Sequence, residues 1–287
     1  MAKAADTDLI LNPDGSIYHL NLLPRHISDT VIAVGDPGRV YQVSQHFDDV
    51  EFEMNKREFI THVGVYKGKR ITVISTGIGT DNIELFFTEL DALVNMDLKT
   101  REPKSRKKKL KVIRIGTSGA IQEDIPLGAH LVTDFAVGFD NLMDFYDLKM
   151  DEFESTVAND IQQALKLPAK PYVVRGSDAL AKQFGGDMIV GNTVTSPGFY
   201  APQGRVVRIP IKYPRLLEDL NYYHYKGADF WLTNFEMESA GYYAMARLLG
   251  HEALSVNAII ANRIKGRFSK DPQKVVDALI KSVLDRI

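Results

Sequence analysis

The segment from Val112 to Gly119 (VIRIGTSG) constrains the fold of this chain more than any other. Its first four residues are β-branched and apolar except for Arg114, which predicts a buried strand with one charge inside it. A buried arginine is costly unless a group of opposite charge pairs with it. The glycines that follow predict a turn whose N–H groups and hydroxyls can bind an anion. Two interpretations stay open: an internal salt bridge, or one wall of an oxyanion pocket.

Strand patterns alternate with helix patterns along the rest of the chain. Apolar runs bounded by turn residues predict strands over residues 31–34, 59–66, 70–75, 129–134, 172–174, 187–193 and 253–261. Helical spacing predicts helices over residues 40–47, from Asp81 with a capping box to Glu84, over 154–167, over 236–249 and from Asp271 onward. No linker or internal repeat interrupts this order. We therefore predict a single α/β domain, residues 1–287, around a parallel or mixed central β-sheet with flanking helices.

Composition excludes several classes of function. The formal net charge is −2, so the chain as a whole does not attract nucleic acid or a membrane surface. The chain has no cysteine, which excludes disulfides, thiolate catalysis and cysteine-ligated zinc. No signal-peptide pattern opens the sequence, and no apolar run approaches the ~18 residues of a membrane span. We expect a cytoplasmic protein.

One local run is strongly basic. Residues 99–109 contain seven lysines and arginines between a predicted helix and a predicted strand. Such a run is either a nucleic-acid or partner patch or a solvated surface loop. It contains no aromatic residue on which a base would stack, and this favours the loop.

Four strand-to-turn junctions look alike, and ligands collect at the carboxyl ends of strands in open α/β sheets. The junctions are residues 35–39, 75–79, 116–119 and 262–267. Arg39 and Arg114, together with Thr117 and the backbone donors, predict a site for a small dianion such as inorganic phosphate. The phosphate-binding loop pattern and the dinucleotide fingerprint are both missing from the sequence, which argues against a nucleotide cofactor.

Two further segments carry candidate ligand contacts. Glu236 and Glu238 precede a helical pattern, where a carboxylate either accepts sugar hydroxyls or simply favours the helix N-terminus. Phe199 offers a flat face for a base, while Gln203 and Arg205 offer donors and an acceptor for the O=C–N–H–C=O edge of a pyrimidine. Alternatively, the segment with Phe199, Gln203 and Arg205 is a surface turn rich in proline and glycine that binds no ligand.

Taken in order, these segments resemble the hexameric type of the nucleoside phosphorylase family. The matching motifs are GDPGR (35–39), STGIG (75–79), RIGTSG (114–119), EMES (236–239) and the loop FYxxQxR (199–205). The last is similar to the base-reading loop of the members that act on uridine. The resemblance runs from His19 to the final helix, and it implies a mixed sheet that is partly closed into a barrel.

The resemblance also implies roles for individual residues. Phosphate would be bound by Gly35, Arg39, Arg57, Arg114 and Thr117, and ribose by His19, Glu236, Met237 and Glu238. The base would be bound by Phe199, Gln203, Arg205, Ile260 and Arg263. His19 and Arg57 would act on the neighbouring subunit's site. Some relatives bind a structural potassium ion (K+) between subunits at the positions of Glu58, Ile71 and Ser75.

The implied reaction is reversible phosphorolysis of uridine to uracil and ribose 1-phosphate, a step of pyrimidine salvage. Inorganic phosphate is the co-substrate and no cofactor is required. The implied assembly is at least a homodimer, and a hexamer would be a trimer of dimers. Three alternatives remain: a purine nucleoside phosphorylase, a nucleosidase of the same fold, and a non-catalytic nucleoside-binding protein.

Overall fold

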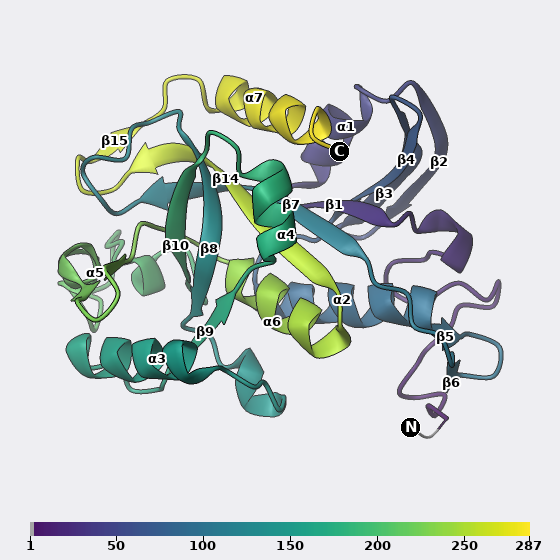
Figure 1. Ribbon diagram of the computed structural model, residues 1–287, viewed down its shortest axis with the longest axis horizontal. Helices are drawn as coiled ribbons and strands as arrows, with labels where there is room; N and C mark the ends of the chain where they lie inside the picture. The colour runs from purple at the N-terminus through teal and green to yellow at the C-terminus, as the bar shows by residue number, and fades with distance from the viewer. Residues whose placement is uncertain (1–2) are drawn as a thin grey trace.

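A computed structural model describes residues 3–287 and contains one large mixed sheet (Figure 1). Strand β7 (Lys111–Ala120) pairs with three other strands of this sheet. It runs parallel to β1 (Thr30–Val34) on one side and to β14 (Glu252–Asn262) on the other. Its last two residues also pair with β13 (Asn234–Glu236). The segment that opened the sequence analysis is therefore the strand that joins the two parts of the sheet.

Five strands close into a ring, which confirms the partly closed barrel. Strand β14 pairs with β7 and β8, β8 with β10, β10 with β13, and β13 with β7. From β7 an open sheet continues through β1, β4, β3 and β2. The other strands of the sheet are β2 (Asp49–Lys56), β3 (Phe59–Tyr66), β4 (Lys69–Ser75), β8 (His130–Gly138), β9 (Tyr172–Arg175), β10 (Ile189–Thr195) and β15 (Arg267–Phe268).

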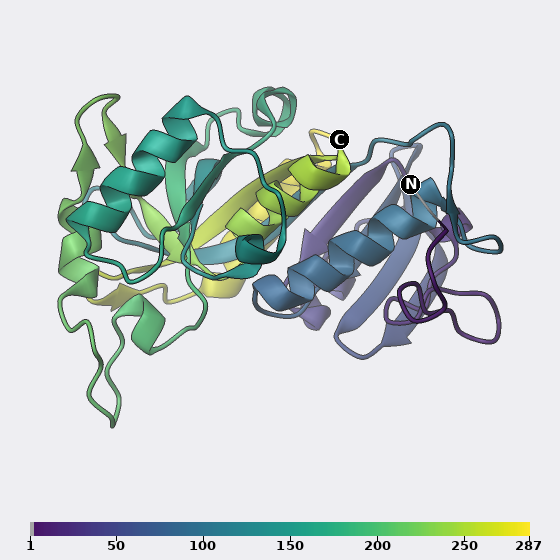
Figure 2. The same cartoon turned by 90° about the horizontal axis from the view of Figure 1, so that it is seen from below.

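Helices cover the sheet in layers. Helices α2 and α6 lie on one face and α7 on the other, while α3 covers the part built from β8 to β10 (Figures 1 and 2). Alternate residues of β1 point to opposite faces of the sheet, and each face has its own hydrophobic core. Val31 and Ala33 pack with α2 and α6, whereas Ile32 and Val34 pack with α1 and α7. The helices are α1 (Pro37–Ser44), α2 (Thr80–Asn95), α3 (Glu152–Ala164), α4 (Asp178–Phe184), α5 (Leu216–Tyr222), α6 (Ser239–Leu249) and α7 (Pro272–Leu284).

The smaller elements lie outside the main sheet. Within residues 3–287 there are three short 3₁₀ helices, Pro24–His26, Leu142–Phe145 and Ala201–Gln203. Two small hairpins are formed by β5 (Met96–Asp97) with β6 (Glu102–Pro103), and by β11 (His224–Tyr225) with β12 (Phe230–Trp231).

The predicted turn at residues 116–119 is wrong. Strand β7 continues to Ala120, and Gly119 lies within it, paired with Phe235 of β13 and Ala261 of β14. Glycine usually weakens a strand, but here partners on both sides hold the extended backbone. Gly116 also makes room for the side chain of Arg114, which lies where a β-carbon would be.

Four predicted helix starts are also wrong, and two of them are late by two or three residues: α1 begins at Pro37 and α3 at Glu152, where 40 and 154 are predicted. Helix α2 begins at Thr80 after Gly79, whose φ of 98° only glycine adopts readily, so Asp81 lies in the first turn and does not cap the helix. Helix α6 begins at Ser239, and Glu236 ends strand β13 instead. The predicted C-cap of α6 and the predicted N-cap of α7 are both confirmed. Gly250 ends α6 with φ 78°, and the Asp271 side chain accepts a hydrogen bond from the Lys274 N–H at the start of α7.

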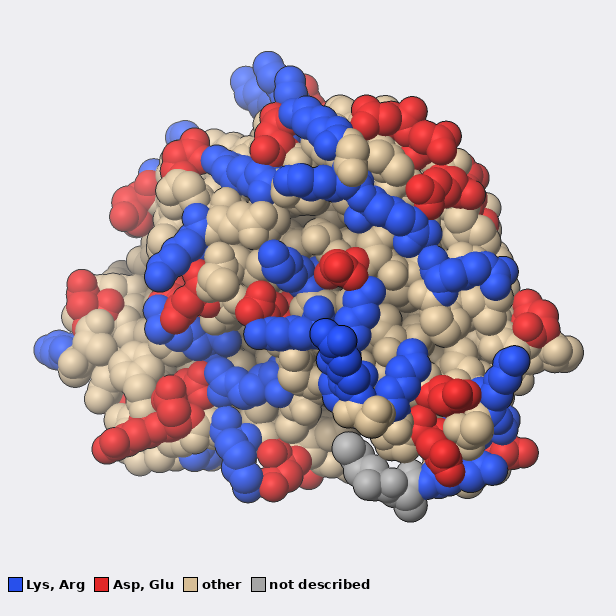
Figure 3. All heavy atoms as spheres, turned by 45° about the vertical axis from the view of Figure 1, so that its right-hand side comes forward, with Lys and Arg blue, Asp and Glu red and all other residues tan. Residues whose placement is uncertain are grey.

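The basic segment 99–109 is an ordered connection between α2 and β7. The ammonium groups of Lys104 and Lys107 donate to the carbonyl oxygens of Val94 and Asn95, at 2.9 and 3.1 Å. They thus satisfy carbonyl groups at the C-terminus of α2, where positive charge is favourable. On the face shown in Figure 3, Lys and Arg side chains are interspersed with Asp and Glu. Within residues 3–287, no helix is long and apolar enough to cross a membrane.

Candidate active site

A cavity of about 800 Å³ lies at the carboxyl ends of β1, β4 and β13 and along the last residues of β7 and β14. Its volume is in the range of small-molecule sites. Three of the four predicted junctions contribute to it, and only residues 262–267 do not. Twelve of the predicted site residues line it: Gly35, Arg39, Glu58, Arg114, Thr117, Phe199, Gln203, Arg205, Glu236, Met237, Glu238 and Ile260. His19, Arg57, Ile71, Ser75 and Arg263 do not.

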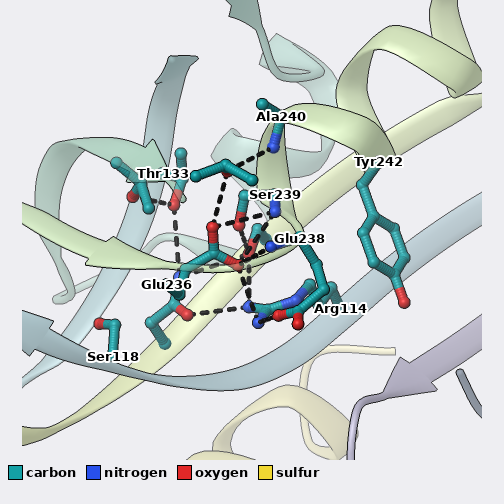
Figure 4. A network of polar contacts seen from close by, with 12 residues as sticks. Arg114, Ser118, Thr133, Glu236, Glu238, Ser239, Ala240 and Tyr242 are labelled. Atoms are coloured by element: carbon teal, nitrogen blue, oxygen red, sulfur yellow. Dashed lines mark hydrogen bonds and ion pairs between the residues drawn. The ribbon is translucent and has the colours of Figure 1, made fainter. Parts of the chain in front are cut away.

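Arg114 is the centre of a buried ion cluster (Figure 4). Its Nη2 lies 2.8 Å from the carboxylate of Glu236 and 2.6 Å from that of Glu238. Burial alone would lower the pKa of Arg114, but the two carboxylates outweigh it and raise that pKa above its ordinary value. The internal salt bridge is therefore present, and it borders the cavity.

The two glutamates have different partners. The carboxylate of Glu236 accepts the hydroxyl of Thr195 at 2.7 Å and the N–H groups of Glu238 and Ser239 at 2.9 Å. It therefore caps the N-terminus of α6. The carboxylate of Glu238 accepts the N–H of Gly79 at 3.0 Å. Burial raises the pKa of Glu238, Arg114 opposes this, and the charge of Glu236 raises it further.

Arg39 lies at the other end of the cavity, and no acidic residue among residues 3–287 pairs with it. Its Nη1 donates to the carbonyl oxygen of Ile115 at 3.2 Å, and its buried Nε has no hydrogen-bond partner. Within residues 3–287 no carboxylate lies within 4.0 Å of it. Burial and the nearby charge of Arg114 lower the pKa of Arg39. A positive charge that is partly desolvated and unpaired favours an incoming anion.

The third part of the cavity holds an amide next to two arginines. Gln203 is 2% exposed, and its Oε1 accepts a hydrogen bond from Nη1 of Arg205. The guanidinium of Arg205 lies 3.8 Å from the ring centroid of Phe199. Arg263 stands behind this wall and donates to the carbonyl oxygen of Gln203 at 3.2 Å. Burial and the charge of Arg263 lower the pKa of Arg205 to about 10.

The cavity also contains residues that the sequence did not single out. Asp36 caps α1 by accepting the N–H of Gly38, and Asn82 comes from the first turn of α2. Ser118 and Phe268 also line the cavity. Asp36 lies within the GDPGR motif and Ser118 within the RIGTSG motif, so the sequence offers both as candidate site residues. Asn82 and Phe268 carry no sequence signal, because only the packing of α2 and β15 brings them to the cavity.

Two predicted site residues gather elsewhere, around Tyr18. Nδ1 of His19 lies 2.7 Å from the carboxylate of Glu89 on α2. The guanidinium of Arg57 lies 6.0 Å from the ring centroid of Tyr18. Arg57 is exposed and has φ 53°, which is unusual for a residue other than glycine. Both residues therefore lie outside the cavity of their own chain.

The residues predicted for potassium do not converge within one chain. Ile71 is fully buried in β4 and pairs with Thr30 and Gly64. The hydroxyl of Ser75 donates to the carbonyl oxygen of Glu58 and accepts the N–H of Ile60. Ile71 and Ser75 are four positions apart along the strand, which corresponds to about 13 Å. The predicted potassium site lies between two subunits, so it stays a prediction.

Comparisons with known proteins agree on one family. The pattern of the phosphorylase superfamily matches residues 29–285. A uridine phosphorylase of Thermococcus kodakarensis is 30% identical over 264 residues, which cover 91% of this chain and 83% of that protein. A purine nucleoside phosphorylase of Vibrio cholerae is 24% identical over 270 residues, covering 93% and 96%. The structure of a Trypanosoma brucei nucleoside phosphorylase that shows uridine phosphorylase activity has a TM-score of 0.89 at 27% identity, covering 97% and 99% of the two chains.

Proposed function

The chain belongs to the phosphorylase superfamily, and on this premise we propose that it catalyses the reversible phosphorolysis of uridine to uracil and ribose 1-phosphate. The curated relative from Thermococcus kodakarensis carries the name of that activity. The observation that carries the proposal is the pair of unneutralised arginines in one cavity, Arg39 at one end and Arg205 beside Gln203 at another.

Phosphate would bind at Arg39. Gly35 begins the turn that leads to Arg39, and Thr117 lines the same cavity with its hydroxyl. Nη1 of Arg114 donates to Ser255 and Asn257, and Nη2 pairs with Glu236 and Glu238, so the terminal nitrogens of Arg114 are already occupied. Arg39 therefore supplies most of the charge that a phosphate dianion needs from this chain.

Ribose would lie against Met237 and Glu238. Glu238 uses one carboxylate oxygen for Arg114 and the other for the N–H of Gly79. Each carboxylate oxygen has two lone pairs, so both oxygens retain one for a sugar hydroxyl. Arg114 holds this carboxylate in place, and that restraint lowers the entropy cost of binding the sugar.

The pyrimidine edge matches Gln203 and Arg205. Uracil presents an acceptor, a donor and an acceptor in sequence, which require a donor, an acceptor and a donor from the protein. Arg205 supplies one donor, Oε1 of Gln203 supplies the acceptor, and Nε2 of Gln203 supplies the other donor. Oε1 already accepts from Arg205, and its second lone pair remains for the N–H of the base.

The proposed chemistry consists of positioning and electrostatics. Cleavage of the glycosidic bond builds positive charge at C1′ and negative charge on uracil. The phosphate held by Arg39 stabilises the first charge and forms the new bond to C1′. Gln203 and Arg205 stabilise the charge on the uracil oxygens, and a donor of this kind contributes about 10²–10³ in rate.

A purine substrate is the nearest alternative, because a purine nucleoside phosphorylase is among the relatives. Phosphorolysis of a purine nucleoside is assisted by an acid that protonates N7. The strand end on the base side reads Ala261, Asn262 and Arg263 and offers no acid. Nδ2 of Asn262 donates to the carbonyl oxygens of Gln122 and Ile125, so this side chain has a structural role.

The proposed enzyme is at least a homodimer, and a hexamer would be a trimer of dimers. His19 and Arg57 do not line the cavity of their own chain. Both are cationic or hydrogen-bonding groups of the kind that phosphate and ribose require. We expect them to complete the site of a neighbouring copy, with no nucleic acid or membrane as a partner.

The substrate assignment is tested by comparing uridine and inosine at saturating phosphate. Absorbance follows loss of each nucleoside, and chromatography identifies the free base. We expect uracil from uridine and much slower release of hypoxanthine from inosine. Cleavage of inosine with uridine untouched would contradict the pyrimidine assignment. Binding of uridine without turnover would favour the non-catalytic alternative.

A further inference from the structure

Two buried polar residues of β14 lie beside the guanidinium of Arg114. Nη1 of Arg114 donates to Oγ of Ser255 at 3.1 Å and to Oδ1 of Asn257 at 2.9 Å. Both side chains are 0% exposed, and neither lines the cavity. They therefore contact the ion cluster from outside the cavity.

The strand register explains why these two positions meet the guanidinium. In the parallel pairing of β7 and β14, Ser255 lies opposite Arg114 and Asn257 lies opposite Gly116. The Arg114 side chain turns along its own strand and lies over Gly116. A β-carbon at Gly116 would be 2.0 Å from Nη1, so glycine is required for this conformation. Gly116, Ser255 and Asn257 together form a cradle for the guanidinium.

The amide of Asn257 is itself oriented. Its Nδ2 donates to the hydroxyl of Thr133 and to that of Ser255, both at 3.3 Å. Thr133, which is seen in Figure 4, is in turn 2.7 Å from the hydroxyl of Thr193. With both amide hydrogens committed there, the amide oxygen faces Arg114. The barrel interior thus fixes the acceptor before any ligand arrives.

We propose that Ser255 and Asn257 are positioning residues for the ribose-binding carboxylate. They accept both hydrogens of Nη1, which fixes the rotation of the guanidinium plane. Nη2 is then directed between Glu236 and Glu238, and Glu238 is held where it can receive sugar hydroxyls. This inference rests on the proposed function for the identity of the sugar contact.

The test compares uridine with 2′-deoxyuridine in the variant Asn257→Leu. The variant keeps the size of the side chain and removes the acceptor. A hydrogen bond to a charged group is lost, so we expect kcat/KM for uridine to fall about 10- to 100-fold. For 2′-deoxyuridine we expect a smaller fall, because that substrate has already lost one hydroxyl contact. The ratio of the two kcat/KM values should therefore decrease at least about fivefold.

Two further variants separate positioning from general damage. Ser255→Ala removes one of the two acceptors with less disturbance, and the ratio should shift in the same direction by less. Thr72→Val is the matched control, because Thr72 is buried with hydrogen bonds to Ser28 and His26 and does not line the cavity. Its melting temperature should fall, but its substrate ratio should stay at the wild-type value.

The outcomes distinguish the inference from the proposed function. If Asn257→Leu and Ser255→Ala both keep the wild-type ratio while wild-type protein phosphorolyses uridine, the positioning role is wrong and the function stands. If wild-type protein leaves uridine intact with phosphate present, the proposed function fails and the inference fails with it.

Discussion

At the scale of single residues, Arg39 and Arg205 have separate tasks in one cavity. Arg39 is expected to bind phosphate, and Arg205 is expected to bind the base with Gln203. Arg39→Ala should raise the KM for phosphate about 10- to 100-fold, because a charge-assisted contact is lost. Arg205→Ala should lower kcat/KM for uridine about 10²- to 10³-fold and leave the KM for phosphate unchanged.

The control for both variants is Arg70→Ala. Arg70 pairs with Glu51 on the surface and does not line the cavity, so its loss should change neither parameter. Initial rates with each substrate varied in turn supply the KM values. Loss of phosphate binding in Arg205→Ala would show that this arginine belongs to the phosphate site instead.

Burial of the Glu238 carboxylate is expected to reduce the stability of the folded protein. Its pKa is raised in the folded protein, so its ionised form is less favourable there than in the unfolded chain. Glu238→Gln should therefore melt at a higher temperature than wild type at neutral pH. The difference should shrink as the pH falls through the raised pKa, because wild type then binds the proton. Activity on uridine should be lost at every pH.

Thermal denaturation across a pH series measures this difference. A Gln variant that melts below wild type at neutral pH would contradict it, and would mean that the bonds to Arg114 and Gly79 outweigh the burial of charge.

At the scale of elements, the basic segment acts as a cap for α2. Lys104 and Lys107 donate to carbonyl groups at the end of that helix. The double change Lys104→Ala and Lys107→Ala should remove about 0.3–1 kcal/mol at each position. This corresponds to a fall of about 1–4 °C in melting temperature, with kcat/KM unchanged.

The matched control for the capping role is Arg106→Ala in the same segment. Arg106 is exposed and has no hydrogen-bond or ion-pair partner within residues 3–287. Its melting temperature should equal that of wild type. Equal effects of both changes would show that charge alone, and no capping contact, stabilises the segment.

Hydrophobic periodicity predicts the buried faces of helices well, whereas glycine residues predict turns poorly in this chain. The apolar face predicted for α2, which includes Phe86, Leu90 and Leu93, is fully buried. The glycines of β7 are predicted to form a turn, because the sequence does not show the strands that pair with β7 on both sides. Glu236 is likewise predicted to lie in a helix, although this residue ends β13 and caps α6 through its side chain. Local patterns cannot show which partner fixes a flexible backbone.

At the scale of the whole molecule, the ring of five strands determines what the cavity contains. Residues 116–119, 199–205 and 236–238 are far apart in sequence and meet because β14 pairs with both β7 and β8. Residues 35–39 join them because β1 pairs with β7. The motifs were predicted from sequence, and their convergence followed from the family resemblance. Asn257 and Ser255 could not be predicted, since their role depends on the register between two distant strands.

Shared sites between subunits give a prediction at this scale. Arg57→Ala and Arg114→Ala should each have little activity as pure proteins. Mixed and reassembled, they should recover part of the activity, because some assemblies pair an intact cavity with an intact Arg57. Initial rates of uracil formation before and after mixing measure the recovery. A fully active monomer would contradict the shared site.

The measurement that tests the central claim most directly is the rate of uracil formation from uridine as inorganic phosphate increases from zero. Arg39 and Arg205 lack acid partners within residues 3–287, and they lead us to expect no reaction without phosphate. The rate should saturate with phosphate, and one ribose 1-phosphate should form for each uracil. Release of uracil at a rate independent of phosphate, with free ribose as the product, would contradict the claim.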